Sequence, residues 1–218
     1  GLNYELIKHA ARCITARARG HRALELGCAS GVMTEELAAR FPQLDVVEAA
    51  ASYAQRARAL LPEAGRVYQC LFEEFRPRHD YDVVVMTWVL EHVLDPRGLL
   101  ARARGWMAPG SEIFIVVPNA ESLHRRVGLH MGLLAGLNEL NDSDLAIGHR
   151  RVYTWDTLSE DIAAAGLDLV TMEGIMLKPL SSAQMEAWPS DLPAAFFALA
   201  PLAPRLCSEI FAVCRNPD

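Results

Sequence analysis

The sequence predicts an α/β fold in which a mainly parallel sheet is covered by helices. Strand-like segments alternate with helix-like segments, and glycines and prolines separate them. In addition, residues 83–86 (Val-Val-Val-Met) are apolar at every position, as in a strand buried on both faces. The chain has 218 residues, 51% of them hydrophobic, which is enough for one such domain with a full core and short for two. We therefore expect a single domain over residues 1–218.

The first half of the chain alternates helices and strands regularly. Helices are expected where apolar residues recur at helical spacing: 4–18, 31–41 and 51–61. The second and third of these end at Pro42 and Pro62, because proline cannot continue a helix. Strands are expected at short apolar runs: 22–27, 44–48, 66–70 and 81–87.

The second half of the chain adds elements of the same two kinds. Strands are expected over 113–117, 167–176 and 209–214, and helices over 96–107, 120–140, 156–165 and around 194–202. Asp95 caps the first of these helices, and Gly166 ends the third.

Composition and charge argue against several classes of protein. The formal net charge of −6 argues against a protein that binds nucleic acid through a basic surface. No apolar run reaches the roughly 18 residues of a membrane-spanning helix, and no signal peptide is visible. The cysteines form no Cys-x-x-Cys pair and are interpreted as small hydrophobic residues: Cys13, Cys28, Cys70, Cys207 and Cys214. We expect a cytoplasmic protein without nucleic-acid or membrane partners.

Residues 24–31 (Leu-Glu-Leu-Gly-Cys-Ala-Ser-Gly) form the predicted hinge between the first strand and the next helix. Gly27 and Gly31 let the backbone turn sharply and approach a ligand closely. The helix N-terminus presents free N–H groups that can meet a carboxylate, and Glu25 can take an ammonium group. The alternatives are an ordinary tight turn and a dinucleotide-binding loop, but the G-x-G-x-x-G spacing of the latter fails here.

A carboxylate at the end of the second predicted strand is a second signal. In nucleotide sites on such sheets, a carboxylate about 20 residues after the glycine loop commonly binds ribose hydroxyls. Glu48 ends the segment Leu-Asp-Val-Val-Glu at about that distance from the hinge. The two signals agree in spacing and in strand context, so they predict a site for a nucleoside-containing cofactor.

Four parts of the chain carry motifs of a known family. They are residues 25–31 (Glu-Leu-Gly-Cys-Ala-Ser-Gly), 46–48 (Val-Val-Glu), 81–86 with 89–93 (Tyr-Asp-Val-Val-Val-Met and Val-Leu-Glu-His-Val), and 106–111 (Trp-Met-Ala-Pro-Gly-Ser). Together they resemble the small, single-domain class I S-adenosylmethionine-dependent methyltransferases, over residues 20–120 as the cofactor-binding core. The resemblance implies a Rossmann-like three-layer sandwich whose seven-stranded sheet has the order 3-2-1-4-5-7-6, with the seventh strand antiparallel. It also implies in-line methyl transfer from S-adenosylmethionine, which leaves S-adenosylhomocysteine (EC 2.1.1.-).

Two positions depart from the family pattern. Ala29 stands where the family has the middle glycine of its first motif, and alanine fits there with a negative φ. After the third strand, the family often has a polar residue against the adenine amino group, whereas Leu71 and Phe72 stand here and are expected to sandwich the ring. The predicted cofactor contacts are Glu25, Gly27, Cys28, Ala29, Gly31, Glu48, Ala49, Leu71, Phe72, Thr87, Trp88 and His92.

The methyl acceptor is expected outside the carboxyl ends of the strands, where ligands of open α/β sheets bind. A hydroxyl acceptor needs a base, for which we predict His149 first, His92 second and His124 third. The alternatives are packing beneath the cofactor for His92 and a structural loop role for His149. The predicted acceptor contacts are Asn119, His124, His149, Arg150 and Tyr153, with packing for Tyr153 and a surface ion pair for Arg150 as alternatives. No metal-binding cluster is evident in the sequence, so we predict an enzyme that needs no metal.

Residues 119–155 are expected to form an acceptor-binding insertion or lid. Within it, the apolar stretch 127–141 predicts either a flexible cover that excludes water or the contact face of a homodimer. This region and residues 178–181 (Lys-Pro-Leu-Ser) also resemble methyltransferases of sugar and natural-product pathways. We therefore expect methylation at oxygen or nitrogen of a small polar acceptor. The alternatives are methylation of protein or RNA, and a non-catalytic partner protein with this fold.

Overall fold

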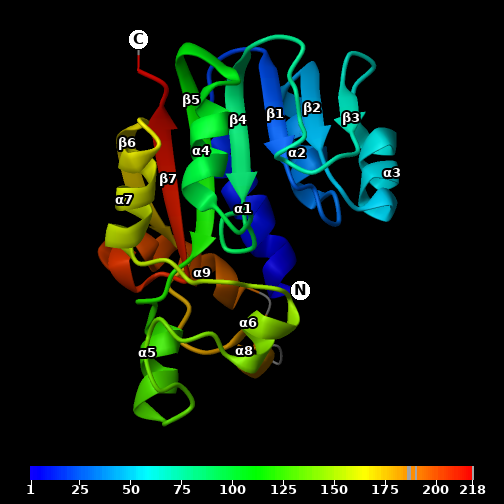
Figure 1. Ribbon diagram of the computed structural model, residues 1–218. Helices are drawn as coiled ribbons and strands as arrows, with labels where there is room; N and C mark the ends of the chain where they lie inside the picture. Colours follow the sequence, from blue (N-terminus) through cyan, green and yellow to red (C-terminus); the bar gives the residue numbers. More distant parts are fainter. Residues whose placement is uncertain (186–187, 190, 218) are drawn as a thin grey trace.

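One sheet of seven strands runs through the part of the chain that the computed structural model describes, residues 1–185, 188–189 and 191–217 (Figure 1). The other positions of the predicted range 1–218 lie outside that description. The strand order is β3-β2-β1-β4-β5-β7-β6 and β7 is antiparallel to both neighbours, which confirms the predicted fold class. The strands are β1 (Arg22–Leu26), β2 (Gln43–Val47), β3 (Arg66–Tyr68), β4 (Tyr81–Thr87), β5 (Met107–Pro118), β6 (Asp168–Ile175) and β7 (Glu209–Arg215).

Strand β4 shows why an apolar residue stands at every position of its central run. Successive side chains of a strand point to opposite faces of the sheet. Val84 and Met86 therefore join the core on one face, and Val83 and Val85 join the core on the other. All four are fully buried. Burying a side chain of this size contributes about 1.5–3 kcal/mol, so this run anchors the centre of the sheet.

Helices cover both faces of the sheet and complete three layers (Figure 1). Leu100 and Ile162 place α4 and α7 against one face, in the core that contains Val84. Ile14 and Leu37 place α1 and α2 against the other face, together with α3. The bounds of these helices are α1 (Leu2–Arg17), α2 (Val32–Arg40), α3 (Ala51–Leu60), α4 (Pro96–Arg104) and α7 (Trp155–Ala164).

The shorter helices gather beyond the carboxyl end of β4, in the lower part of Figure 1. They are α5 (Leu123–His130), α6 (Asp142–Ala146), α8 (Ser182–Met185) and α9 (Leu192–Leu199), followed by 3-10 turns at Ala200–Leu202 and Pro204–Leu206. The edge where the parallel strands end is therefore enclosed by segments that come late in the chain.

Among the described residues, no helix has both the length and the apolar character needed to span a membrane.

The prediction of one helix over 120–140 is wrong. α5 ends at His130, and Gly132 adopts a left-handed φ of 72° that a right-handed helix excludes. Arg125 is buried and donates hydrogen bonds to the carbonyl oxygens of Leu137 and Glu139, which folds the following loop back onto α5. The glycines of this stretch thus interrupt the helix that its apolar residues favour.

Strand β5 begins earlier than the predicted 113–117. Met107 already pairs with Tyr81 of β4, and the register of this ladder shifts between Tyr81 and Val83. Pro109 and Gly110, the latter with a left-handed φ of 76°, therefore lie within the bounds of the strand, as an irregularity near its start.

Candidate active site

A cavity of about 610 Å³ opens at the carboxyl edge of the sheet. Its walls come from α1, the hinge after β1, the ends of β2 and β4, the segment after α6 and the start of β7. The predicted site residues that line it are Gly27, Cys28, Ala29, Glu48, Phe72, Thr87, Trp88, His92 and His149. Residues predicted for the cofactor and residues predicted for the acceptor therefore meet at one cavity.

The hinge between β1 and α2 contains three left-handed residues. Gly27 and Gly31 have φ angles of 72° and 85°, a region that glycine enters without steric cost. Ala29 has a φ of 43°, so the expected negative φ at this position is wrong. A left-handed alanine costs about 1–2 kcal/mol, which the contacts around the hinge must offset. One such contact is the hydrogen bond of 2.9 Å from the Gly27 N–H to the carbonyl oxygen of Val47.

The Glu48 carboxylate joins this hinge to the turn after β2. One of its oxygens accepts a hydrogen bond from the Cys28 N–H at 3.2 Å, and the other accepts one from the Ala50 N–H at 2.8 Å. The oxygen that faces the Cys28 N–H also lies 3.7 Å from the Cys28 thiol, whereas the oxygen that faces Ala50 keeps a further lone pair, and the side chain lines the cavity. A carboxylate held in this way can accept hydrogen bonds from the hydroxyls of a ribose.

Part of the predicted cofactor set lies away from the lining of this cavity: Glu25, Gly31, Ala49 and Leu71. Leu71 is 55% exposed. Glu25 is 1% exposed, and within the described part of the chain neither of its carboxylate oxygens has a hydrogen-bond partner. Burial, with the charge of Glu48 as a smaller cause, raises the pKa of Glu25 to about 8. Its contact with an ammonium group stays a prediction.

Two arginines after α6 brace the turn that follows β4. Arg151 donates hydrogen bonds to three carbonyl oxygens of this turn, those of Leu90, Val93 and Leu94. Arg150 donates to the carbonyl oxygen of His92 at 3.0 Å. Both arginines thus have a structural role here, and a contact of Arg150 with an acceptor stays a prediction.

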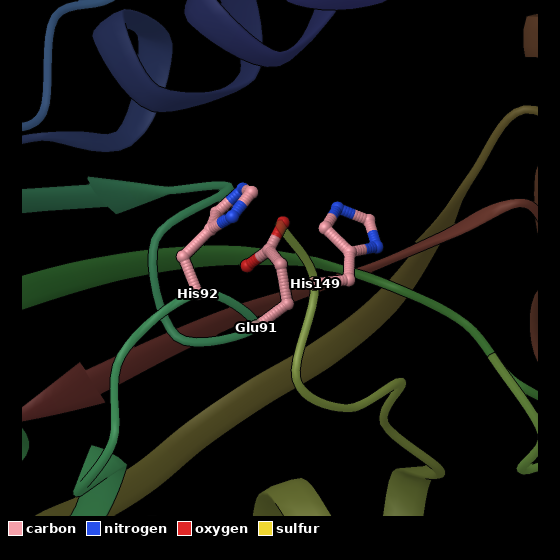
Figure 2. Close-up of side chains that lie close together, drawn as sticks. All are labelled: Glu91, His92 and His149. Atoms are coloured by element: carbon pink, nitrogen blue, oxygen red, sulfur yellow. The ribbon is translucent and has the colours of Figure 1, made fainter. Parts of the chain in front are cut away.

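Glu91, His92 and His149 point toward one another in the cavity (Figure 2). A carboxylate oxygen of Glu91 and one nitrogen of each ring all lie within 4.8 Å of one another. The ring centroids are 4.8 Å apart and the ring planes are inclined by 72°. Glu91 is fully buried, and this burial raises the pKa of its carboxyl group to about 8. The group can exchange protons, and its donor set also suits a metal ion, so the predicted metal independence stays a prediction.

Each histidine of this group has its Nδ1 turned toward an oxygen. The Nδ1 of His92 lies 3.3 Å from the carbonyl oxygen of Gly148, and that of His149 lies 3.4 Å from a carboxylate oxygen of Asp144. Asp144 in turn forms an ion pair of 3.0 Å with Arg125. Burial alone would raise the pKa of Asp144, but its contacts with His149, a backbone N–H and Arg125 lower it to about 2. Asp144 is therefore ionised and faces the Nδ1 of His149, a contact that sequence reasoning missed.

Three other predicted acceptor residues lie outside the lining of the cavity. Asn119 is 1% exposed, and its side-chain amide donates to two backbone carbonyl oxygens at 2.8 and 2.9 Å. Tyr153 is 2% exposed, and its hydroxyl lies 3.2 Å from Asp161. His124 borders a separate pocket of about 250 Å³, and burial lowers its pKa to about 3. Contacts of these residues with an acceptor stay predictions.

Some lining residues were missed by the predicted site set, among them Asn3, Leu6 and Ile7 of α1, Glu91, Ile147, Lys178 and Glu209. Glu209 is buried and accepts a hydrogen bond of 3.1 Å from the indole N–H of Trp88. It begins β7, and because β7 is antiparallel, this start lies at the edge where the parallel strands end. A charged residue directly before the apolar run 210–214 of the final strand is the signal that could have pointed to it. Helix α1 carries no comparable signal.

The profile of a methyltransferase-domain family matches residues 2–172. A ubiquinone biosynthesis O-methyltransferase from Idiomarina loihiensis is 29% identical over 168 residues, which are 74% of this chain and 67% of that protein. A second protein of that name, from Aromatoleum aromaticum, is 30% identical over 46% of this chain and 45% of its own length. The crystal structure of the N-methyltransferase NodS from Bradyrhizobium japonicum, in complex with S-adenosylhomocysteine, has a TM-score of 0.63 at 17% identity and covers 100% of this chain and 88% of that one.

The chain belongs to this methyltransferase-domain family, since the match extends over most of its length. Together with the strand order and the structural neighbour, this defines a class I S-adenosylmethionine-dependent methyltransferase (EC 2.1.1.-). Its methyl donor is S-adenosylmethionine. The structural likeness by itself shows the fold, because the identity with NodS is only 17%.

Proposed function

We propose that the protein transfers a methyl group from S-adenosylmethionine to an oxygen or nitrogen of a small polar acceptor. The observation that carries this proposal is the shared cavity, which contains both Glu48 and the group of Glu91, His92 and His149. β1 lies between β2 and β4, so the ends of these two strands are separated by about 10 Å, twice the spacing of neighbouring strands. A cofactor whose ribose binds Glu48 can extend across the hinge and present its methyl group to the side chains of Glu91, His92 and His149.

The cofactor would be held by three parts of the cavity. The methionine carboxylate meets the N–H groups at the start of α2, next to the hinge. The ribose hydroxyls bind Glu48. The adenine ring packs on Phe72, which lines the cavity, whereas the exposed Leu71 contributes less to this packing. This arrangement leaves the sulfonium methyl on the side of β4.

For a hydroxyl acceptor, we assign removal of the proton to His149. Asp144 faces the Nδ1 of this ring, orients it, and stabilises the imidazolium that forms when Nε2 takes the proton. His92 is the second candidate, and burial followed by the neighbouring His149 lowers its pKa. The acceptor oxygen then forms a bond to the methyl carbon as the carbon–sulfur bond breaks, and that electron pair leaves on the sulfur of S-adenosylhomocysteine.

Oxygen is the favoured acceptor atom, because the curated relatives carry the name O-methyltransferase. The polar side chains Glu91, Lys178 and Glu209 line the cavity and suit an acceptor with several hydroxyl groups, such as a sugar or a natural-product intermediate. Met131 and Leu133 are 60% and 67% exposed, which is compatible with a lid over residues 127–141 and equally with a homodimer contact. The five cysteines are free, which supports the proposed cytoplasmic location.

Calorimetric titration with S-adenosylmethionine and S-adenosylhomocysteine tests the cofactor part of the proposal. We expect binding of both, and binding of neither would overturn it. The acceptor part is tested by incubating the enzyme with S-adenosylmethionine carrying a labelled methyl group and with panels of phenols, sugars and amines. Label in a phenol or sugar supports methylation at oxygen, and label only in an added protein or RNA would contradict a small acceptor.

A further inference from the structure

Glu91, His92 and His149 have the composition and spacing of a metal-binding group. Three atoms that lie within 4.8 Å of one another can surround an ion at about 2.8 Å or less, the distance from the centre of such a triangle to its corners. Zinc–nitrogen and zinc–carboxylate bonds measure about 2.0–2.2 Å. Rotations of the side chains that move each ligand atom by less than about 1 Å would therefore complete the coordination.

The Glu91 carboxylate is the clearest indication that a cation belongs here. Its side chain is fully buried, and neither of its oxygens has a hydrogen-bond partner within residues 1–185, 188–189 and 191–217. Buried carboxylates without a partner are costly and are usually paired with a cation or a metal. In Figure 2 the carboxylate lies between the two imidazole rings, and a ring nitrogen of His149 is turned toward it.

The surroundings of the two histidines resemble those of metal ligands. A metal-bound histidine usually donates the hydrogen of its other ring nitrogen to a carboxylate or a backbone carbonyl, which fixes the orientation of the ring. Here the Nδ1 of His149 faces Asp144 at 3.4 Å, and the Nδ1 of His92 faces the carbonyl oxygen of Gly148 at 3.3 Å. Both contacts leave Nε2 as the nitrogen that binds the ion.

We propose that Glu91, His92 and His149 bind a divalent transition-metal ion through one carboxylate oxygen and two imidazole nitrogens. Two nitrogens with one carboxylate favour Zn²⁺, Mn²⁺, Fe²⁺, Co²⁺ or Ni²⁺ over Mg²⁺ and Ca²⁺, which prefer oxygen ligands only. All three residues line the cavity, so the remaining coordination positions are open to a ligand bound there.

The catalytic role of this ion rests on the proposed function. It would bind the acceptor hydroxyl, lower its pKa so that the proton leaves to water, and hold the resulting oxygen in line with the methyl group. When the metal ion is bound, the Nε2 of His149 is a metal ligand and cannot also act as the base. Loss of turnover after removal of the metal, with recovery on addition of Zn²⁺, supports the ligand role. Full turnover of the metal-free enzyme would instead support His149 as the base.

Metal binding itself is tested without any acceptor, on protein that has been treated with a chelator and dialysed. Titration with Co²⁺, followed by its visible absorption and by calorimetry, should show one site per chain, and Zn²⁺ but not Mg²⁺ should displace the cobalt. His92→Ala and His149→Ala should each weaken binding by about 10-fold or more, and Asp144→Asn by about 10- to 100-fold. The exposed His130 of α5 provides the matched control, since His130→Ala should bind like the wild type.

Affinity for S-adenosylhomocysteine, measured on the same preparations, shows that each variant is folded. The absence of Co²⁺ and Zn²⁺ binding by the wild type would overturn the inference, and so would wild-type affinity in both His92→Ala and His149→Ala. Metal binding without cofactor binding would overturn the proposed function alone. Cofactor binding without metal binding would overturn the metal site alone.

Discussion

Replacement of Gly27 by valine tests where the cofactor binds. Gly27 has a φ of 72°, and a Cβ added there would lie 3.3 Å from Val89 Cγ2 and 3.7 Å from Phe72 Cζ. Both of these side chains line the cavity. The valine side chain would therefore fill space beneath the hinge that the proposed cofactor position needs.

A second glycine allows the backbone cost of this change to be separated from its effect on binding. Gly132 has the same φ of 72°, and a Cβ added there meets no atom of the described residues within 4 Å. A left-handed side chain costs about 1–2 kcal/mol at either position. For a chain of this size, 1 kcal/mol shifts the Tm by about 2–4 °C, so Gly27→Val and Gly132→Val should both melt roughly 2–8 °C below the wild type.

Only Gly27→Val should lose the cofactor. We expect its affinity for S-adenosylhomocysteine to fall by at least about 100-fold, equivalent to about 2.7 kcal/mol, in calorimetry well below the Tm. Gly132→Val should keep the wild-type affinity. Wild-type affinity in Gly27→Val would refute the placement of the cofactor over the hinge, and an equal loss in both variants would show that the effect comes from folding.

Three further predictions concern other residues of the site and its surroundings. Glu48→Ala should weaken S-adenosylhomocysteine binding by about 10-fold or more, because hydrogen bonds to a charged group contribute about 1.5–3 kcal/mol; unchanged calorimetric affinity would remove Glu48 from the site. His149→Ala should lower turnover and leave cofactor affinity intact, and it has no part in the reaction if turnover is unchanged. Burial, followed by the charges of Lys178 and Arg125, lowers the pKa of His124 from 6.5 to about 3, so below pH 6.5 the unfolded chain binds a proton that the folded chain excludes. Above pH 6.5 the histidine therefore costs the folded state nothing. Below it, the free energy of unfolding falls by about 1.4 kcal/mol per pH unit. Urea unfolding at about pH 7 and about pH 5 should therefore show a loss about 2 kcal/mol larger in the wild type than in His124→Gln, and equal losses would contradict the buried neutral imidazole.

Most elements of the sheet could be predicted because their signals are local. The apolar run of β4 follows from burial on both faces, and Pro42 and Pro62 stop helices through their own geometry. The stretch 120–140 also contains many apolar residues, yet the chain leaves the helix after His130. There the outcome depends on Gly132 and on the distant hydrogen bonds of Arg125, which spacing along the chain does not reveal.

The cofactor side of the cavity was predictable for a related reason. Gly27 and Glu48 directly follow two adjacent parallel strands, so they lie side by side at the same edge of the sheet. Their spacing along the chain, one strand–helix–strand unit, is therefore enough to identify them as a pair. The conformation of Ala29 was not predictable, because its positive φ is imposed by the hinge on both sides of it rather than preferred by alanine.

The acceptor side depends on contacts between segments more than 50 residues apart, and this is why sequence reasoning treated His92 and His149 as rivals for one role. The turn after β4 carries His92, and the segment after α6 carries His149; Arg150 and Arg151 hold the two segments together through backbone carbonyl oxygens. Once joined, the two imidazoles lie on either side of the buried Glu91. The Nδ1 of His92 faces the carbonyl oxygen of Gly148, next to His149, and the Nδ1 of His149 faces Asp144 of α6. A histidine considered alone can be a base or a packing residue, but two histidines that flank an unpaired carboxylate form a site for a cation. The reactivity of this half of the cavity therefore depends on Glu91, His92 and His149 together. The effect of a single substitution must be interpreted together with whether these three residues hold a proton or a metal ion.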